Sequence, residues 1–352
     1  MNRLSAERRA RVLSALVEGN SIRATCRMTG VAKGTVMTLL ADAGAACMEH
    51  QDANLRNLPC RRIECDEIWS FVYAKAKNVP ESHRGEFGYG DIWTWTAIDA
   101  DTKLVPAWMV GTRDAQTANI FMADLASRLA HRVQLTSDGH KPYLEAVERA
   151  FGGEIDFATL VKLYGNDPEA EKRYSLAKCL GTERHTISGK PERKLISTSY
   201  VERQNLTMRM GMRRFTRLTN AFSKKVENLE YAVALHFMHY NFCRPHKTLS
   251  DPYPTTPAMA AGVADHVWSI GAIVALVEAV SPSRWRSVPR ESGGQHRTEA
   301  AARHSGPACR PQCQVASSPN PDVPEGRAPS EGGYALHLDE LSQPPRGRHG
   351  RS

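Results

Sequence analysis

Between residues 62 and 161 the sequence changes repeatedly between two hydrophobic periods, and the order of these changes limits the possible folds. Stretches rich in β-branched and aromatic residues indicate strands, and apolar residues at helical spacing indicate helices. The predicted strands lie at 62–73, 92–100, 103–111, 133–139 and 155–161, and the predicted helices at 115–130 and 143–151. This order predicts an α/β fold in which a mixed sheet is flanked by helices.

The N-terminal segment predicts an all-α unit. Residues 4–17, 22–29 and 33–43 have helical patterns, and Gly30 with Val31 forms a tight turn between the second and third. Two short helices joined by a glycine-containing turn are typical of a helix-turn-helix. The side chains expected to face DNA are Lys33, Thr35 and Thr38. The alternative is an ordinary three-helix unit that binds protein.

Composition and pattern divide the chain into five expected parts. These are a helix-turn-helix domain (1–45), a linker (46–60), the α/β domain (61–262), a C-terminal helix (263–280) and a tail (281–352). The tail is rich in Pro, Gly, Ser and Arg and has few large apolar residues. It is expected to be disordered, because it cannot bury enough surface to offset its chain entropy.

The charge of the chain favours a polyanionic partner. There are 46 Lys and Arg against 38 Asp and Glu, so the formal net charge is +8, although a mildly basic balance alone proves little. No run of about 18 apolar residues is present, so no membrane span is expected. The eight cysteines have no disulfide-like spacing. We therefore expect a reduced, cytoplasmic protein.

The stretch from Ser199 to Lys225 predicts a long basic helix with one carboxylate, Glu202, in its first turn. From residue 203 onward it contains seven Lys or Arg and no Asp or Glu. Leu206, Met210 and Leu218 recur at roughly helical spacing and are expected to form its buried face. The candidate DNA contacts are Arg203, Arg209, Arg213, Arg214, Arg217, Arg244 and His246. The alternatives are a solvated cationic helix and, for Arg244 and His246, a loop that ends a helix.

Three carboxylates far apart in sequence are expected to converge beside the sheet. Asp66 lies within the first predicted strand, where a charge is costly unless it is paired or binds a cation. Asp138 follows the fourth strand, and Glu202 begins the basic helix. Such a set can hold two Mg²⁺ (or Mn²⁺) ions for phosphoryl transfer. Strand alternation is expected to point the neighbouring Glu67 away from Asp66.

The motifs around these carboxylates resemble those of insertion-sequence transposases of the DDE class, which have a ribonuclease H-like core. The residues that carry the resemblance are Cys65–Trp69, Thr136–Gly139, Tyr200–Asn205, Tyr240–Asn241, Arg244–His246, Leu249 and Thr256–Pro257. The sequence is most similar to the insertion-sequence-one type, over about residues 5–260. Some members carry a cysteine zinc finger before the helix-turn-helix. This sequence starts at the helical part, so recognition of element ends is expected from residues 20–45, unless the element belongs to a divergent branch.

The resemblance implies that Asp66, Asp138 and Glu202 form a catalytic triad that binds metal. It implies nicking at the ends of an insertion element, followed by attack of the freed 3′-hydroxyl on target DNA. The implied partners are the element ends, the target DNA and further copies of the chain assembled on DNA. Two alternatives remain: a DNA-binding regulator or remnant without catalysis, and a nuclease that cuts without joining. Trp69, Trp93 and Trp95 are expected to pack in the sheet.

Overall fold

The β-rich part of the chain forms one six-stranded mixed sheet in the computed structural model, which describes residues 4–165, 178–216, 220–250 and 252–279. Its strands are β1 (Arg62–Val72), β2 (Gly90–Asp99), β3 (Ala107–Gly111), β4 (Gln134–Ser137), β5 (Asp156–Gly165) and β6 (Lys178–Ser188). The spatial order is β3-β2-β1-β4-β5-β6. Strands β1, β4 and β5 are parallel, whereas the pairs β1–β2, β2–β3 and β5–β6 are antiparallel. The expected mixed sheet flanked by helices is confirmed.

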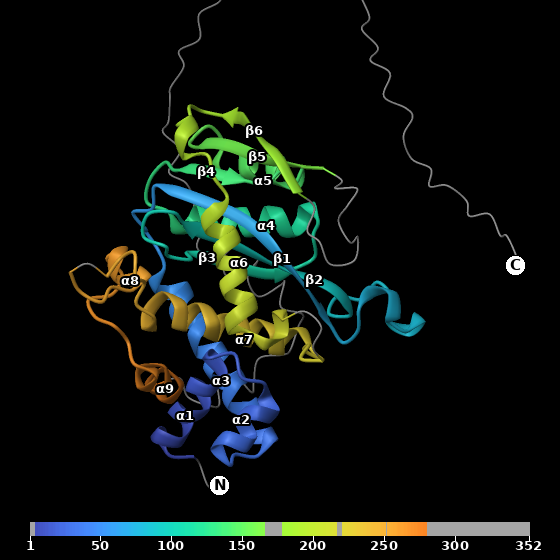
Figure 1. The fold of residues 1–352 in the computed structure, drawn as a ribbon, viewed down its shortest axis with the longest axis vertical. Coiled ribbons are helices and arrows are strands. Elements are labelled where there is room, and N and C mark those ends of the chain that lie inside the picture. Colours follow the sequence, from blue (N-terminus) through green and yellow to red (C-terminus); the bar gives the residue numbers. More distant parts are fainter. Residues whose placement is uncertain (1–3, 166–177, 217–219, 251, 280–352) are drawn as a thin grey trace, which may run out of the picture. The chain divides into compact units, whose positions relative to one another are not determined.

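Some of the helices lie along this sheet and the others lie below it in the view of Figure 1. The helices are α1 (Ala6–Val17), α2 (Ile22–Thr29), α3 (Lys33–Asn54), α4 (Ala115–Arg128), α5 (Pro142–Phe151), α6 (Ser199–Gly211), α7 (Val226–Met238), α8 (Pro257–Ala260) and α9 (Ile270–Ala279). The 3₁₀ turns η1 (Ala76–Asn78) and η2 (Glu81–His83) lie between β1 and β2, and η3 (Arg193–Leu195) lies between β6 and α6. The 3₁₀ turn η4 (Arg213–Phe215) follows α6, and the π-helical turn η5 (His239–Cys243) follows α7.

Different helices cover the two faces of β1 and β2. Glu67 lies opposite Trp95 in the antiparallel register, so the two share a face. The buried ring of Trp95 packs there against Phe121 of α4 and Tyr143 of α5. On the other face, the carboxylate of Glu64 accepts hydrogen bonds from the first turn of α6. Both faces of β1 are therefore buried near its start.

Helix α3 is longer than the sequence pattern indicated. It continues through the expected linker to Asn54, because residues 46–54 pack against α7. Buried Gln51 donates hydrogen bonds to the carbonyls of Cys47 and Ala234. The buried positions of α3 are mostly small residues, so its apolar face is weak in the sequence. The division into separate domains stays a prediction.

Strand β6 was missed by the sequence analysis, which predicted neither a strand nor a helix between residues 161 and 199. It pairs antiparallel with β5 at the edge of the sheet. Its side chains from Cys179 to Ser188 are exposed or half-exposed. A strand without a buried face has no alternating hydrophobic pattern, and such a pattern is the signal from which strands are predicted.

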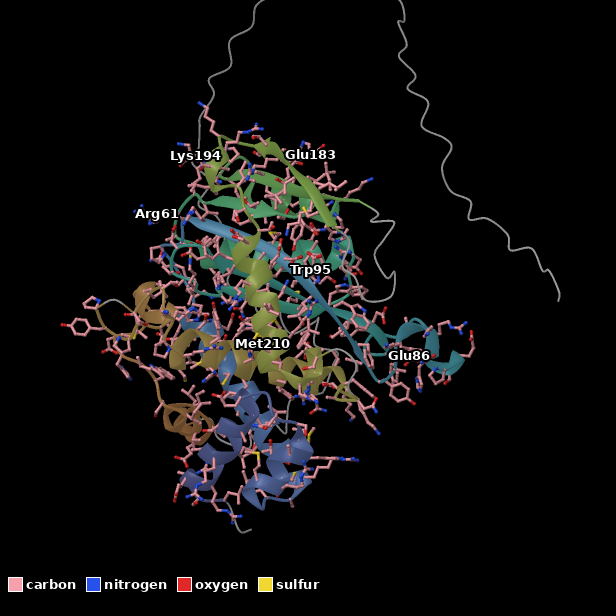
Figure 2. The ribbon with its side chains drawn as sticks, in the orientation of Figure 1. Arg61, Glu86, Trp95, Glu183, Lys194 and Met210 are labelled. Atoms are coloured by element: carbon pink, nitrogen blue, oxygen red, sulfur yellow. The ribbon has the colours of Figure 1, made fainter. Side chains whose placement is uncertain are left out.

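The expectation for α6 was wrong in two respects. First, the helix ends at Gly211, so Arg213 does not continue its face. Second, Leu206 and Met210 are exposed, by 42% and 73% (Figure 2), and Leu218 lies outside the described residues. The buried face carries Val201, Gln204, Asn205 and Met208 instead. This face is partly polar because it meets the carboxylates of β1.

The N-terminal helices have defined ends and a small apolar core. Ser21 caps α2, and Gly30 follows it in the left-handed conformation. Val31, Val36 and Leu40 are buried. Within the described residues, no single helix is long and apolar enough to cross a membrane. Only α2 and α3 taken together, bent by 112°, pass such a test on length and composition.

Two glycines of α3 provide a test of its packing. A Cβ atom at Gly44 would lie 2.4 Å from the Cβ of Tyr231 in α7, whereas one at Gly34 would meet nothing within 4 Å. Gly44→Ala should lower the free energy of unfolding by about 1–3 kcal/mol through overpacking. Gly34→Ala should instead raise it, by at most about 1 kcal/mol, through helix propensity. Urea denaturation measures both, and equal effects would contradict the α3–α7 contact.

Candidate metal centre

The carboxylate cluster lies where the shortest of the parallel strands ends. Strand β4 stops at Ser137, which pairs with Cys65 of β1 and Thr159 of β5. The strands on its two sides, β1 and β5, each continue for several residues beyond this point. Residues just beyond position 65 in β1 and 159 in β5 therefore have no β4 partner. The carboxyl ends of parallel strands are the usual place for functional groups in such sheets.

Three carboxylates meet at this end of β4. One oxygen each from Asp66, Glu67 and Asp138 lie within 4.8 Å of one another. The expectation that Glu67 points away from Asp66 was therefore wrong. Alternation puts the two side chains on opposite faces of β1, but the strand edge is open here. Both carboxylates can reach around it toward Asp138.

The surroundings of the Asp66 side chain disfavour its ionised form. Its Oδ1 accepts a hydrogen bond from the Glu67 N–H and its Oδ2 accepts one from Asn205 Nδ2, each 2.8 Å long. Burial, followed by repulsion from the carboxylates of Asp138 and Glu202, raises its pKa from 3.8 to about 6. A bound cation would relieve both effects.

Glu202 is close enough for its charge to act on Asp66, but it has other partners. It lies in the first turn of α6 and forms an ion pair with Lys162 of β5. Its Oε1 also accepts a hydrogen bond of 2.6 Å from the hydroxyl of Thr198. The three residues expected as a triad thus lie in one region, and Glu67 lies closer to the two aspartates than expected.

Arg113 neutralises the other side of the cluster. Its Nε donates to Glu67 Oε2 at 3.0 Å, and its Nη2 lies 3.7 Å from Asp138 Oδ2. The Glu67 side chain is only 1% exposed. Burial raises the pKa of Glu67 to about 7, against the lowering effect of the nearby Tyr143 hydroxyl and of Arg113. Arg113 and Lys162 thus place positive charge where carboxylates converge.

The donor set fits a hard divalent cation. All three clustered side chains offer carboxylate oxygens, the ligands that Mg²⁺ and Mn²⁺ prefer. Two further oxygens, Glu67 Oε1 and Asn205 Oδ1, are buried without a hydrogen bond of ordinary geometry to any described residue. Buried acceptors of this kind are normally satisfied. Asp66, Glu67 and Asp138 could therefore hold a metal ion.

The N-terminus of α6 is fixed by a carboxylate that sequence reasoning did not assign. Glu64, 3% exposed, accepts hydrogen bonds from the N–H groups of Tyr200 (2.7 Å) and Val201 (3.1 Å). Thr198 at the N-cap makes no side-chain capping bond, so Glu64 takes that role from β1. A carboxylate at a helix N-terminus also interacts favourably with the helix dipole. This contact places Glu202 and Asn205 beside Asp66.

The predicted DNA contacts are distributed over several elements. Lys33, Thr35 and Thr38 are exposed on the first turns of α3, and Arg203, Arg213 and Arg244 are also exposed. Arg209 and Arg214 are half-buried, and Arg217 lies outside the described residues. Arg214 donates to the hydroxyl of Ser223 at 2.8 Å. Burial lowers the pKa of half-buried His246 to about 4, so its ring is neutral at pH 7.

Arg113, Lys162 and Asn205 were missed, although each has a signal in the sequence. Lys162 is a charge in the apolar second half of β5, whose other charged residue, Asp156, lies at the start of the strand. Asn205 follows Glu202 by three residues, so the two share a helix face. Arg113 precedes Asp114, which caps α4. None of these signals identifies a partner, which only the folded chain provides.

Comparison with known proteins adds little. No protein-family model matches the sequence, and no curated protein matches it. Among solved structures, the chain is similar to a "piggyBac transposase synaptic complex with hairpin DNA", studied by cryo-electron microscopy. The two are 11% identical, and the match covers 88% of this chain and 78% of that chain with a TM-score of 0.35. A TM-score this low supports no conclusion about fold or function.

The raised pKa of Asp66 predicts how stability depends on pH. The folded state holds the proton up to about pH 6 and the unfolded state only to about 3.8, so stability falls as pH rises between these values. In EDTA, the free energy of unfolding should decline by about 3 kcal/mol over this window through Asp66. Asp66→Asn should flatten the decline in urea denaturation. An unchanged slope would show that Asp66 does not carry this proton.

Proposed function

We propose that this chain is a DDE transposase of the insertion-sequence-one type that cuts and joins DNA strands by metal-dependent phosphoryl transfer. The observation that carries the proposal is the meeting of Asp66 and Asp138 at the end of β4, with Glu202 close enough to raise the pKa of Asp66. These are the carboxylates around which the sequence resembles such transposases.

The arrangement of elements supports a ribonuclease H-like core. Strands β1, β2 and β3 form an antiparallel meander, and β4 and β5 follow parallel to β1 with α4 and α5 as crossovers. The N-terminal helices support a helix-turn-helix, because α2 and α3 meet at 112° with a left-handed Gly30 between them. Recognition helices of that motif place their N-terminal residues in the major groove. In this chain those residues include Lys33 and Thr35.

In this proposal Asp66, Asp138 and Glu202 would be the ligands of two divalent cations. Two such cations would activate the attacking hydroxyl and stabilise the leaving oxygen during in-line displacement. Asn205 holds Asp66 in place through its amide, and Glu64 fixes the helix that carries Asn205. Thr198 limits the movement of Glu202 through its hydrogen bond.

Lys162 and Arg113 balance the negative charge of the cluster before cations arrive. Four neighbouring carboxylates repel one another, and each positive side chain offsets part of this cost. Lys162 pairs with Glu202, and Arg113 lies between Glu67 and Asp138. Cation binding would require Lys162 to release Glu202. The freed ammonium group could then contact a DNA phosphate.

The exposed arginines supply contacts to the DNA backbone. Arg203 and Arg213 follow Glu202 along the chain, and Arg244 lies just beyond η5. Phosphate contacts of this kind release counterions, so binding should weaken steeply with salt. These residues fix the position of DNA without reading its sequence.

A cleavage assay tests the proposal. The full chain is incubated with labelled DNA that carries its flanking element ends, with Mg²⁺ or with EDTA. Metal-dependent nicks at the ends together with joined products support a transposase. Nicks without joining would indicate a nuclease, and binding without any cleavage would indicate a regulator or remnant; either result overturns the proposal.

Single substitutions separate the roles of the four carboxylates. Asp66→Asn and Asp138→Asn should each lower the rate of cleavage by about 10³-fold or more, because each removes a ligand for the reactive cations. Glu202→Gln should do the same, whereas Glu67→Gln should retain more activity because Glu67 is paired with Arg113. Glu145→Gln on α5, a half-exposed acid elsewhere, is the matched control. Full activity in Glu202→Gln would remove that residue from the triad.

A further inference from the structure

The hairpin formed by β1 and β2 continues beyond the helices that cover the sheet and carries exposed aromatic rings. Figure 1 shows it extending from the sheet past α4 and α5, and Glu86 marks this extension in Figure 2. Trp69 and Phe71 lie on the face of Glu67 by strand alternation. Trp95 on that face is fully buried, whereas Trp69 is 39% exposed. The sheet and its helices therefore cover the ring of Trp69 only in part.

The rings contact one another in two groups. In the first, Phe71 lies between Trp69 and Phe222, with ring centroids 5.8 and 5.0 Å apart. In the second, Tyr89 lies between Tyr73 and His83, and it stacks on His83 at 4.2 Å with an interplanar angle of 4°. We call Trp69, Phe71, Tyr73, Tyr89, His83 and Phe222 the aromatic surface.

The two groups are held next to each other by backbone contacts. Ser223 forms a bridge with Val72 and accepts a hydrogen bond of 2.9 Å from the N–H of Tyr73. Tyr73 has a φ of +65°, which is unusual for a bulky residue and persists only where the surroundings enforce it. Its ring is nevertheless 40% exposed. The fold thus maintains a strained residue whose ring faces solvent.

Positive charge accompanies the aromatic surface. Lys224 and Lys225 are exposed and follow Phe222 by two and three residues. Lys75 Nζ lies 6.0 Å from the centroid of the Phe71 ring. The glutamates of the hairpin, Glu81 and Glu86, are paired with Arg84 and His83. An apolar partner would leave the three lysines without counter-charges, whereas a nucleic-acid strand supplies phosphates.

Exposed aromatic rings bordered by lysines are the features that bind single-stranded DNA. The rings stack on bases, and the cations follow the backbone. Trp69 lies two residues from Glu67 along the strand, which is about 7 Å at the usual rise per residue. A base stacked on Trp69 would therefore bring its phosphate near the carboxylate cluster.

We propose that the aromatic surface binds unpaired bases of the DNA strand that passes the carboxylates. This inference rests on the proposed function, because it assigns the surface to the same DNA. Bases that leave the duplex stack beside the cut need new stacking partners. Trp69 and Phe71 provide these partners next to the site, and Tyr73 with Tyr89 continues them onto the hairpin.

Binding of a fluorescein-labelled single-stranded oligonucleotide, measured by anisotropy in EDTA, tests this inference without catalysis. Trp69→Leu should weaken binding about fivefold or more, and Trp69→Leu with Phe71→Leu should weaken it further, because each stacking ring is lost. Trp69→Phe keeps a ring and should bind nearly as wild type. Tyr253→Leu, at a site 74% exposed on another segment, is the matched control and should have no effect.

Unchanged single-strand affinity in Trp69→Leu would overturn the inference. So would an equal loss of affinity for a blunt duplex, since intact base pairs offer no free faces to the rings. A second copy of the chain as the occupant would appear as a wild-type dimer that Trp69→Leu dissociates in sedimentation without DNA, and this result would also overturn it. Binding is measured in EDTA, so it does not depend on cleavage. A chain that fails to cleave DNA can still show the predicted binding, and a chain that cleaves DNA can still fail to show it.

Discussion

The hydrogen bonds from the first turn of α6 to Glu64 determine the geometry of the candidate site. A helix N-terminus has N–H groups without partners in the helix itself. In α6 two of them donate to a buried carboxylate of β1 instead of to a local cap. The contact fixes α6 at a point two residues before Asp66 on the same strand face. Without it, Asn205 could not reach Asp66, and Glu202 would not lie near the end of β4.

The candidate site brings several carboxylates together, and two positive side chains, Arg113 and Lys162, offset part of their charge. Glu64 is stabilised by the N–H groups of α6, Glu202 by Lys162, and Glu67 and Asp138 by Arg113. Asp66 has only an amide and a backbone N–H as donors, and burial followed by repulsion from Asp138 raises its pKa to about 6. The arrangement is costly for the protein alone, and a bound cation would offset part of this cost. We interpret that cost as the consequence of a site built for metal ions.

Sequence periodicity predicted the central sheet well because most of its strands have a buried face. The order of elements from β1 to β5 agrees with the expectation. Asp66 and Asp138 come together at the end of β4, with Glu67 as their nearest carboxylate neighbour and Glu202 acting on Asp66 through its charge. The prediction of α6 failed because its buried face carries Gln204 and Asn205, which meet polar groups of β1, whereas Leu206 and Met210 face solvent. The failures at β6 and α3 have related causes, since an edge strand without a buried face and a helix packed through small residues show little periodicity. The contacts of Glu67 could not be predicted either, because they depend on where the neighbouring strand β4 ends.

Titration of Mn²⁺ into the full chain, followed by electron paramagnetic resonance, tests the assignment of the metal centre most directly. The assignment predicts saturable Mn²⁺ binding to the wild-type chain and to Glu145→Gln. It also predicts at least about tenfold weaker binding to Asp66→Asn and to Asp138→Asn, because each substitution removes a charged ligand shared by the cluster. Equal Mn²⁺ affinity in all four proteins would contradict it. The carboxylates at the end of β4 would then be a charge cluster balanced by Arg113 and Lys162 alone.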